Sequence, residues 1–276
     1  MKTFEKTSID YSKIHNKKLI RKNIIEAGYK AKETHMGSAL SIAEIMEALY
    51  FRVANITPEN CESDDRDIII VSKGHAALAQ YACLYLKDFM SEEVFKSYGL
   101  DGGILPAHVD RSACKGVEVS TGMSLGHGLG LAQGIAFANR LKGIRSRLFV
   151  VVGDGELQEG SIWEGLNSIA AFDMKEITII IDKNRMQASA PTIDIADYSC
   201  IDSTFRKIGY EVTEVNGHDV DDITNALNKR THKPHIIIAH TIKAHGLTDF
   251  ENTRAAHYVK LSEEQYNEAI ELLEES

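Results

Sequence analysis

The chain of 276 residues has little proline, few cysteines and no long apolar run. With four prolines and no Pro/Ser-rich stretch, the sequence offers no obvious linker between domains. Its four cysteines stand far apart without a C-x-x-C pair, which argues against a disulfide framework or a structural zinc site. No apolar stretch approaches the roughly 18 residues of a membrane span, and the N-terminus does not resemble a signal peptide. These absences predict a soluble, cytoplasmic protein.

Two common catalytic and binding signatures are also missing. The sequence contains no G-x-x-x-x-G-K-[ST] and no H-E-x-x-H. The net charge of −9 and the pI near 5.7 give no reason to expect binding to nucleic acid or to an anionic membrane. An anionic substrate would therefore need local cations or a metal ion in its binding site.

What the sequence does contain is an alternation of apolar strands and longer helical segments. Short apolar runs predict strands within 67–75, 147–156, 176–184, 210–219 and 235–246. Helices are expected over 11–33, 41–54, 76–88, 124–143, 160–172, 219–230 and 261–276. In the second of these, Ser41 and Glu44 match a capping box, and the last is interpreted as a solvated surface helix. The pattern predicts an α/β fold with a parallel β-sheet covered by helices on both faces, as a single domain over 1–276.

The stretch VVGDGELQEGSIWEG places Asp154 between two glycines at the end of an apolar run. Asn184 follows the next such run, and one strand–helix–strand unit would bring both residues to the same edge of a parallel sheet. Carboxylate, amide and main-chain carbonyl oxygens are ligands that Mg²⁺ takes, while Gly153 and Gly155 let the backbone approach a phosphate. The stretch is therefore interpreted as half of a magnesium–diphosphate site. The simpler alternative is a strand-to-helix turn in which Asp154 only caps the helix.

Histidines in or beside Gly- and Ala-rich turns form a second signal. They are His35, His75, His108, His127 and His257. Each one alone could be an ordinary surface or structural histidine. Together they suggest neutral hydrogen-bonding groups lining a site for an anionic or polyhydroxylated ligand, and histidine also moves protons near neutral pH.

The segments GDGELQEGSIWEG and IDKNRMQ together resemble the thiamine-diphosphate fingerprint of transketolases. The segments THMGSALS, IIVSKGHAALAQY, LPAHVD, STGMSLGHGLGLAQGIAFA and EVNGHD follow in the order of that family. The resemblance covers nearly the whole chain and is limited to the N-terminal, diphosphate-binding domain of a full-length transketolase. It implies thiamine diphosphate and Mg²⁺ as cofactors.

The resemblance also implies roles for individual residues. Magnesium would be held by Asp154, Asn184 and the main-chain carbonyl of Met186. The other cofactor contacts would come from His75, Gly122, Leu125, Gly155, Glu156 and His257. His35, His108 and His257 would line the substrate channel and take part in catalysis. Glu159 and Glu164 match acidic residues at the subunit interface, although a solvated first helical turn is the alternative for both.

Three departures from the family pattern bear on the substrate and the ring contacts. STGMSLG holds one extra residue in the loop expected near the thiazolium ring, so the assignment of Gly122 and Leu125 there is less direct. The segment MQASA has Ser189 and Ala190 where the family has Asp-Gly, and Ala256 replaces a tryptophan before His257. An ordinary pentose-phosphate ketose remains the default donor, and a branched or sulfonated ketose phosphate is the alternative.

The resemblance implies a chain that is catalytically incomplete alone. In the family, a glutamate of the pyrimidine-binding domain activates the cofactor, and this sequence has no second domain to carry it. We therefore expect a separate C-terminal subunit of roughly 300 residues, a domain-scale length, in an α2β2 transketolase acting on sugar phosphates. The alternatives are the α subunit of a 2-oxo acid dehydrogenase and a non-catalytic binding protein with the same fold.

Overall fold

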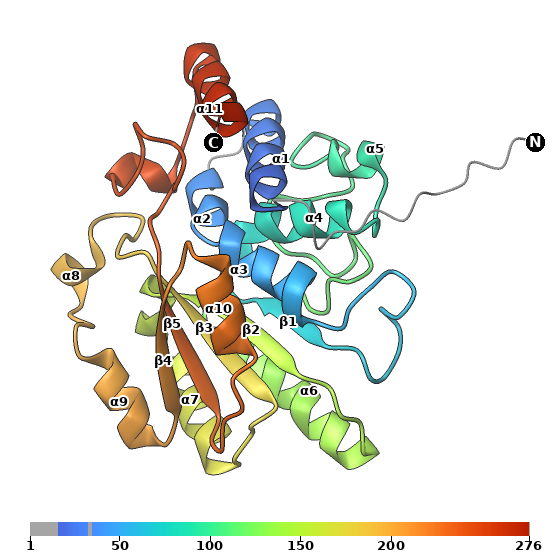
Figure 1. Cartoon of the computed structure of the whole chain (residues 1–276), viewed down its shortest axis with the longest axis vertical. Coiled ribbons are helices and arrows are strands. Elements are labelled where there is room, and N and C mark those ends of the chain that lie inside the picture. The colour runs from blue at the N-terminus through green and yellow to red at the C-terminus, as the bar shows by residue number, and fades with distance from the viewer. Residues whose placement is uncertain (1–15, 33–34, 276) are drawn as a thin grey trace, which may run out of the picture.

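The computed structural model describes residues 16–32 and 35–275, which are arranged around one five-stranded parallel sheet (Figure 1). The strands are β1 (Ile68–Val71), β2 (Leu148–Gly153), β3 (Ile177–Lys183), β4 (Glu211–Asn216) and β5 (His235–His240). Their order across the sheet is β1-β2-β3-β5-β4. Each strand lies inside one of the predicted apolar runs, and the runs extend further because they include the turns at the strand ends.

The register of the strands brings their carboxyl ends to one edge of the sheet. Gly153 at the end of β2 lies beside Asp182 near the end of β3. Lys183 and Asn216 both lie beside His240, the last residue of β5. Because ligands of open parallel sheets bind beyond this edge, the residues that follow these strands are candidates for a functional site.

Helices cover both faces of the sheet, as the alternating pattern predicts. The helices are α1 (Asn16–Ala31), α2 (Met36–Leu40), α3 (Ala43–Glu47), α4 (Ala77–Leu86), α5 (Glu92–Phe95), α6 (Gly128–Lys142), α7 (Gly160–Ala171), α8 (Thr192–Ile195), α9 (Ile201–Ile208), α10 (Val220–Leu227) and α11 (Glu263–Glu275). Val71, Val151 and Ile180 face a core with α1 to α4 and α10. Val150 and Ile179 face a second core with α6, α7 and α9. Strands buried on both faces explain the continuous apolar runs.

The predicted capping box at the start of 41–54 is wrong. The chain instead forms α2, breaks at Ser41 and Ile42, and continues as α3 and a π-helical turn over Ala48–Val53. The Ser41 hydroxyl donates to the Ser38 carbonyl and to Asp182, while Glu44 pairs with Arg21. Bonds to buried charged groups outweigh the local capping pattern because they satisfy groups that have no access to water.

Other helices differ from the predictions mainly at their ends. Helix α6 begins at Gly128, since residues 124–127 form the loop that enters it, and the sequence pattern does not predict α5, α8 or α9. Helix α11 is more than a solvated surface element: it packs beside α1, with the Tyr266 ring stacked on Tyr29 at 4.3 Å between centroids (Figure 1). The predicted helical residues 11–15, 33 and 276 lie outside the described residues.

Within 16–32 and 35–275, no helix is both long enough and apolar enough to cross a bilayer.

Candidate active site

Asp154 lies at the carboxyl end of β2 and contacts the loop that follows β3. Its Oδ1 accepts a hydrogen bond from the Gly155 amide at 2.8 Å. Its Oδ2 accepts from the Arg185 amide at 2.7 Å and from Thr192 Oγ1 at 3.2 Å. Burial, together with the nearby Asp182 carboxylate, raises the pKa of Asp154 to about 6. The predicted meeting of the two strand ends therefore occurs, and it produces a buried carboxylate that a cation would stabilise.

Asn184 and Met186 lie in that same loop with their oxygen atoms in fixed orientations. Asn184 Nδ2 donates to Asp182 Oδ2 at 2.7 Å, which settles which side of the amide carries the oxygen. Asn184 Oδ1 accepts from the Met186 amide at 3.0 Å. Arg185 between them has a φ of 63°, a left-handed conformation that turns the backbone sharply toward Asp154.

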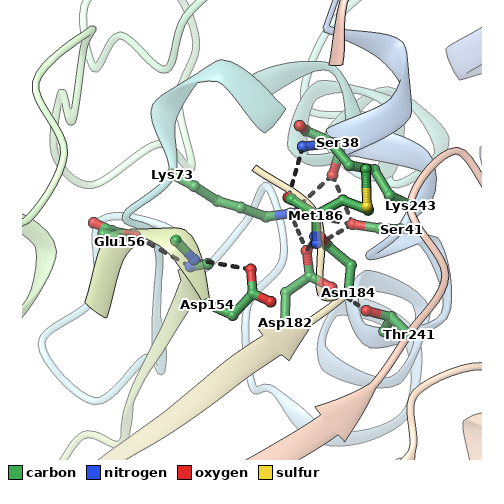
Figure 2. Close-up of polar contacts among 12 residues, drawn as sticks. Ser38, Ser41, Lys73, Asp154, Glu156, Asp182, Asn184, Met186, Thr241 and Lys243 are labelled. Carbon is green, nitrogen blue, oxygen red and sulfur yellow. Dashed lines mark hydrogen bonds and ion pairs between the residues drawn. The ribbon is translucent and has the colours of Figure 1, made fainter. Parts of the chain in front are cut away.

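Asp182 is the centre of a buried polar network beneath the loop (Figure 2). It accepts hydrogen bonds from Lys73 Nζ at 2.6 Å, from Ser41 Oγ at 2.7 Å and from Thr241 Oγ1. Lys73 Nζ also donates to the Ser38 carbonyl at 2.9 Å. Burial raises the pKa of Asp182, but the Lys73 ammonium and the Ser41 and Thr241 hydroxyls together outweigh it, so the pKa is lowered and the carboxylate stays charged.

A second lysine, Lys243, lies on the segment that follows β5. Its Nζ donates to the Met186 carbonyl at 3.1 Å and lies 2.9 Å from His257 Nδ1. Burial and the nearby Lys73 ammonium lower the pKa of Lys243 to about 8. The site therefore holds two lysines close to two aspartates, with positive charge available to an anionic ligand.

Four histidines predicted from the sequence gather at this edge. The His35 ring centroid lies 5.5 Å from that of His75, 5.6 Å from His108 and 5.4 Å from His257. Burial, followed by nearby positive charges, lowers the pKa of His75 well below its usual value and that of His257 to about 3. Both imidazoles are therefore neutral at pH 7 and can donate or accept one hydrogen bond at each nitrogen atom.

Close backbone packing seats His257 against α2. A Cβ atom on Gly37 would lie 1.9 Å from the Ala256 carbonyl oxygen, so only glycine allows the 254–257 turn to approach this closely. His127, the remaining histidine of the predicted group, is exposed at the start of α6 and lies 3.3 Å from Ser124 Oγ.

A cavity of about 570 Å³ adjoins the strand ends. Asp154, Asn184 and Met186 line it on the polar side, and Ile193 and Tyr198 belong to its largely apolar wall. A mostly apolar pocket with a few convergent polar groups is the usual form of a small-molecule site.

The glycines of the predicted site meet different needs. Gly122, in the STGMSLG loop, has a φ of 54°, a left-handed conformation that favours glycine. A Cβ atom on Gly74 would lie 2.2 Å from the Gly122 carbonyl oxygen, so glycine at position 74 lets this loop pack closely. Neither Gly153 nor Gly155 has a positive φ. A Cβ on Gly155 would lie 3.1 Å from Gln187 Cγ, so glycine there keeps the turn clear of the neighbouring loop. Leu125 is half-buried in the same loop as Gly122.

The glutamates of the VVGDGELQEGSIWEG stretch separate into one buried and two exposed residues. Glu156 turns inward, where its carboxylate accepts from Ser72 Oγ, from the Gly126 amide at 2.8 Å and from the Gly153 amide at 3.2 Å. Its side chain therefore connects β1, the α6 entry loop and the Gly-Asp-Gly turn. Glu159 and Glu164 are exposed at the start of α7, and Glu159 makes no side-chain cap.

The residues present suit a divalent metal ion. Asp154, Asn184 and the Met186 carbonyl supply three hard oxygen atoms, and each also accepts a hydrogen bond that fixes its direction. The Asp154 carboxylate is buried, and among the described residues it accepts hydrogen bonds only from uncharged groups. The donor set fits magnesium on its chemistry.

Sequence reasoning missed three side chains that organise this edge: Lys73, Asp182 and Lys243. Lys73 and Asp182 stand inside the segments SKGH and IDKN, where the apolar pattern indicates only the ends of strands. The sequence did contain a signal: a lysine and an aspartate directly beside apolar runs will be buried with them. Burying these charges is costly in free energy unless they pair with each other.

The fold and the site define an α/β domain with buried polar and charged side chains gathered at the carboxyl edge of its parallel sheet. A family model described as "Transketolase, thiamine diphosphate binding domain" matches residues 13–273. The chain belongs to this transketolase family.

Two curated relatives have nearly the same length as this chain. The 6-deoxy-6-sulfo-D-fructose transketolase subunit of Clostridium sp. (strain MSTE9) is 35% identical over 263 residues, covering 94% of this chain and 95% of the relative. The apulose-4-phosphate transketolase subunit of Phocaeicola vulgatus is 35% identical over 253 residues, covering 91% and 89%.

Solved transketolases share the fold but are longer. The Campylobacter jejuni enzyme superimposes with a TM-score of 0.84 at 27% identity, over 98% of this chain and 43% of that one. The Leishmania mexicana enzyme gives 0.85 at 24% identity, over 94% and 40%. The chain thus spans about two fifths of the solved transketolases that it matches.

Proposed function

We propose that this chain is the cofactor-diphosphate subunit of a two-chain transketolase that transfers a two-carbon ketol unit from a ketose phosphate to an aldose. The observation that carries the proposal is the bond from the Arg185 amide to Asp154 Oδ2. This bond holds Asp154 against the loop that carries Asn184 and Met186. Lys243 reaches the same loop, because its Nζ donates to the Met186 carbonyl. The cofactors are thiamine diphosphate and Mg²⁺.

Each group at this edge has a part in the proposed function. Bound thiamine diphosphate would supply the carbanion chemistry that a two-carbon transfer needs. Asp154, Asn184 and the Met186 carbonyl would hold Mg²⁺ against the diphosphate, and Lys243 would add positive charge beside it. The neutral rings of His75 and His257 would each hold a proton at one ring nitrogen, and His35 and His108 would bind the hydroxyl groups of the sugar. Gly122 and Leu125 would lie near the rings of the cofactor, and the Gly155 and Glu156 backbone near its phosphates.

The partner is proposed to be a C-terminal transketolase subunit in an α2β2 assembly. Two relatives of nearly the same length are named as subunits, whereas the single-chain transketolases are more than twice as long. A chain that supplies only the diphosphate side leaves the cofactor's pyrimidine side to another protein.

The donor ketose is proposed to be a sugar phosphate, with two candidates. A pentose-phosphate ketose is the default for the family. A modified ketose is favoured by the names of the two relatives above, which refer to a sulfonated fructose and to apulose 4-phosphate. The Ser189–Ala190 sequence, in a loop closed by a bond from the Gln187 amide to the Ala190 carbonyl, is where this chain departs from the common pattern.

The proposal is tested by purifying the tagged chain from its native host with Mg²⁺ and thiamine diphosphate present. A stoichiometric partner of about 300 residues is then co-purified, and the complex is assayed for ketol transfer with a pentose phosphate, a branched ketose phosphate and a sulfonated ketose. We expect transfer by the complex, none by the isolated chain, and none by a complex carrying Asp154→Ala.

Other outcomes would separate the alternatives. Decarboxylation of pyruvate by the complex, without ketol transfer, would identify a 2-oxo acid dehydrogenase subunit instead. A chain that binds neither a partner nor thiamine diphosphate would be a binding protein that keeps only the fold. Full ketol transfer by the isolated chain would contradict the need for a partner.

A further inference from the structure

The segment 241–245, which follows β5, makes contacts on two opposite sides. Thr241 Oγ1 donates to Asp182, and Lys243 Nζ donates to the Met186 carbonyl, so these side chains face the site. The Ile242 amide and the His245 carbonyl are instead bound by side chains from other parts of the fold. The side chains that bind the Ile242 amide and the His245 carbonyl therefore also fix the backbone position of Lys243, which lies between them.

The groups behind the segment form a buried cluster of Arg21, Glu44 and His218, called here the rear cluster. Arg21 on α1 pairs with Glu44 on α3 through two nitrogen atoms, with Nε to Oε1 at 3.0 Å and Nη2 to Oε2 at 2.6 Å. Arg21 Nη1 also donates to the His245 carbonyl. Glu44 Oε2 lies 2.9 Å from His218 Nδ1.

The partners of His218 determine its tautomer. The Ile242 amide donates to His218 Nε2 at 2.8 Å, and a backbone amide can only donate, so Nε2 carries no proton. Nδ1 must then carry the proton and donate it to Glu44. The His218 ring also lies against the His245 ring, with 3.9 Å between centroids. One imidazole thus connects the charged pair to the backbone beside Lys243.

The backbone of this segment needs such support. Ala244 has a φ of 60°, a left-handed conformation that residues with a side chain adopt at a cost. Its amide donates to the Gly37 carbonyl at 3.0 Å. A strained turn persists only where surrounding contacts hold it, and the rear cluster supplies two of those contacts.

We propose that His218, held by Glu44 and Arg21, is a positioning residue that fixes segment 241–245 so that Lys243 meets the Met186 carbonyl and the cofactor diphosphate. This inference rests on the proposed function for the identity of the ligand. His218 touches neither Lys243 Nζ nor Asp154; it acts through the Ile242 backbone.

The test compares two variants of His218 in the full-length chain. His218→Phe keeps the ring but removes both nitrogen atoms, whereas His218→Gln can still accept from the Ile242 amide and donate to Glu44. The matched control is His235→Phe, which removes a buried histidine at the opposite end of β5, where His235 Nε2 lies 2.9 Å from Thr213 Oγ1.

Two quantities are measured: hydrogen exchange of the Ile242 amide without any ligand, and the affinity for thiamine diphosphate with Mg²⁺. We expect His218→Phe to raise the exchange rate at Ile242 at least about tenfold and to weaken the affinity by about 10–100-fold, the range for lost supporting hydrogen bonds. His218→Gln should restore most of both, and His235→Phe should change neither.

The inference is overturned if His218→Phe and His235→Phe show the same exchange rate at the Ile242 amide and the same affinity for thiamine diphosphate. It is also overturned if His218→Gln loses as much protection and affinity as His218→Phe. If His218→Phe does not fold, His218→Asn, which is too short to reach Ile242, replaces it with the same expectations. If the unaltered chain binds no thiamine diphosphate, the proposed function fails, while the exchange rates still decide whether His218 holds the segment.

Discussion

Two buried ionic clusters lie on opposite sides of segment 241–245, and they differ in how completely their charges are paired. In the rear cluster, Arg21 meets Glu44 with two nitrogen atoms and His218 adds a further bond. The cluster at the strand ends, called here the site cluster, contains Lys73, Asp154, Asp182, Asn184 and Lys243. There Asp182 is paired with Lys73, but within the described part of the chain Asp154 accepts hydrogen bonds only from uncharged groups.

The pKa values of two buried carboxyls show what this difference means. Burial raises the pKa of Glu44, but His218 and Arg21 outweigh it and bring the value to about 2. Burial and Asp182 together raise the pKa of Asp154 to about 6. A carboxylate that is already satisfied stabilises the fold, whereas one that lacks a cation is suited to bind one.

The largest expected effect comes from leaving a charge unpaired in the site cluster. Lys73→Met removes the partner of Asp182, and both residues are almost completely buried. We expect a loss of about 3–5 kcal/mol in the free energy of unfolding, measured in urea. The double variant Lys73→Met/Asp182→Leu should recover part of this loss. A loss below about 1 kcal/mol for the single variant, the level of an exposed pair, would contradict the assignment of a buried pair.

The next effect concerns ligand binding rather than stability. Asp154→Ala should weaken Mg²⁺-dependent binding of thiamine diphosphate more than about 100-fold, or about 2.7 kcal/mol, by titration calorimetry. The free energy of unfolding without ligand should hardly fall, because the removed carboxylate is poorly stabilised. Asp173→Ala, which changes an exposed aspartate paired with Lys175, is the matched control. Equal affinities for the two variants would exclude Asp154 as a metal ligand.

A smaller effect should appear as a pH dependence of the rear cluster. The pKa of Glu44 lies below its ordinary value of 4.5, at about 2, so its stabilising charge is fully present above about pH 4.5 and is lost as the pH falls toward 2. The unaltered chain should therefore exceed Glu44→Gln in unfolding free energy by roughly 3 kcal/mol at pH 7, from a pKa shift of this size. The difference should shrink between pH 4.5 and pH 3. A constant difference over that range would show that the Glu44 charge does not stabilise the fold.

The smallest effect is expected on the exposed start of α7. Glu164→Gln should change the unfolding free energy of the isolated chain by less than about 0.5 kcal/mol, as for most surface substitutions. If Glu164 lies at the subunit interface, as the family resemblance implies, the same variant should weaken assembly with the partner in analytical ultracentrifugation. Unchanged assembly would leave Glu164 with only its contribution to the helix terminus.

Much of this fold could be predicted from the sequence because its strands are buried on both faces. Apolar runs ending at Gly153 and Lys183 indicate the strands, and the parallel arrangement then places Asp154 and Asn184 at one edge. The gathering of His35, His75, His108 and His257 was suggested by their positions in or beside Gly- and Ala-rich turns, and the family resemblance implied their separate roles.

The ionic contacts could not be predicted in the same way. Lys73 and Asp182 meet across 109 positions of the chain, so no local pattern reveals the pair. The capping box at Ser41 and Glu44 failed for the same reason, because both side chains bond to groups far away in the sequence. Local sequence patterns predict the helices and strands, whereas contacts between residues distant in the sequence determine which partners the buried charged side chains bind.

The close seating of the 254–257 turn on Gly37 has a consequence for how the protein is made. A ribosome releases α2 early, but the segment that carries His257 follows more than 200 positions later, after every strand of the sheet. Domains fold as units during synthesis, so the edge of the sheet can form before its last wall is available. A chain interrupted after β5 would lack both Lys243 and His257. Synthesis through His257 is therefore a condition for an assembled site, and the small size of Gly37 is what lets the 254–257 turn pack against α2.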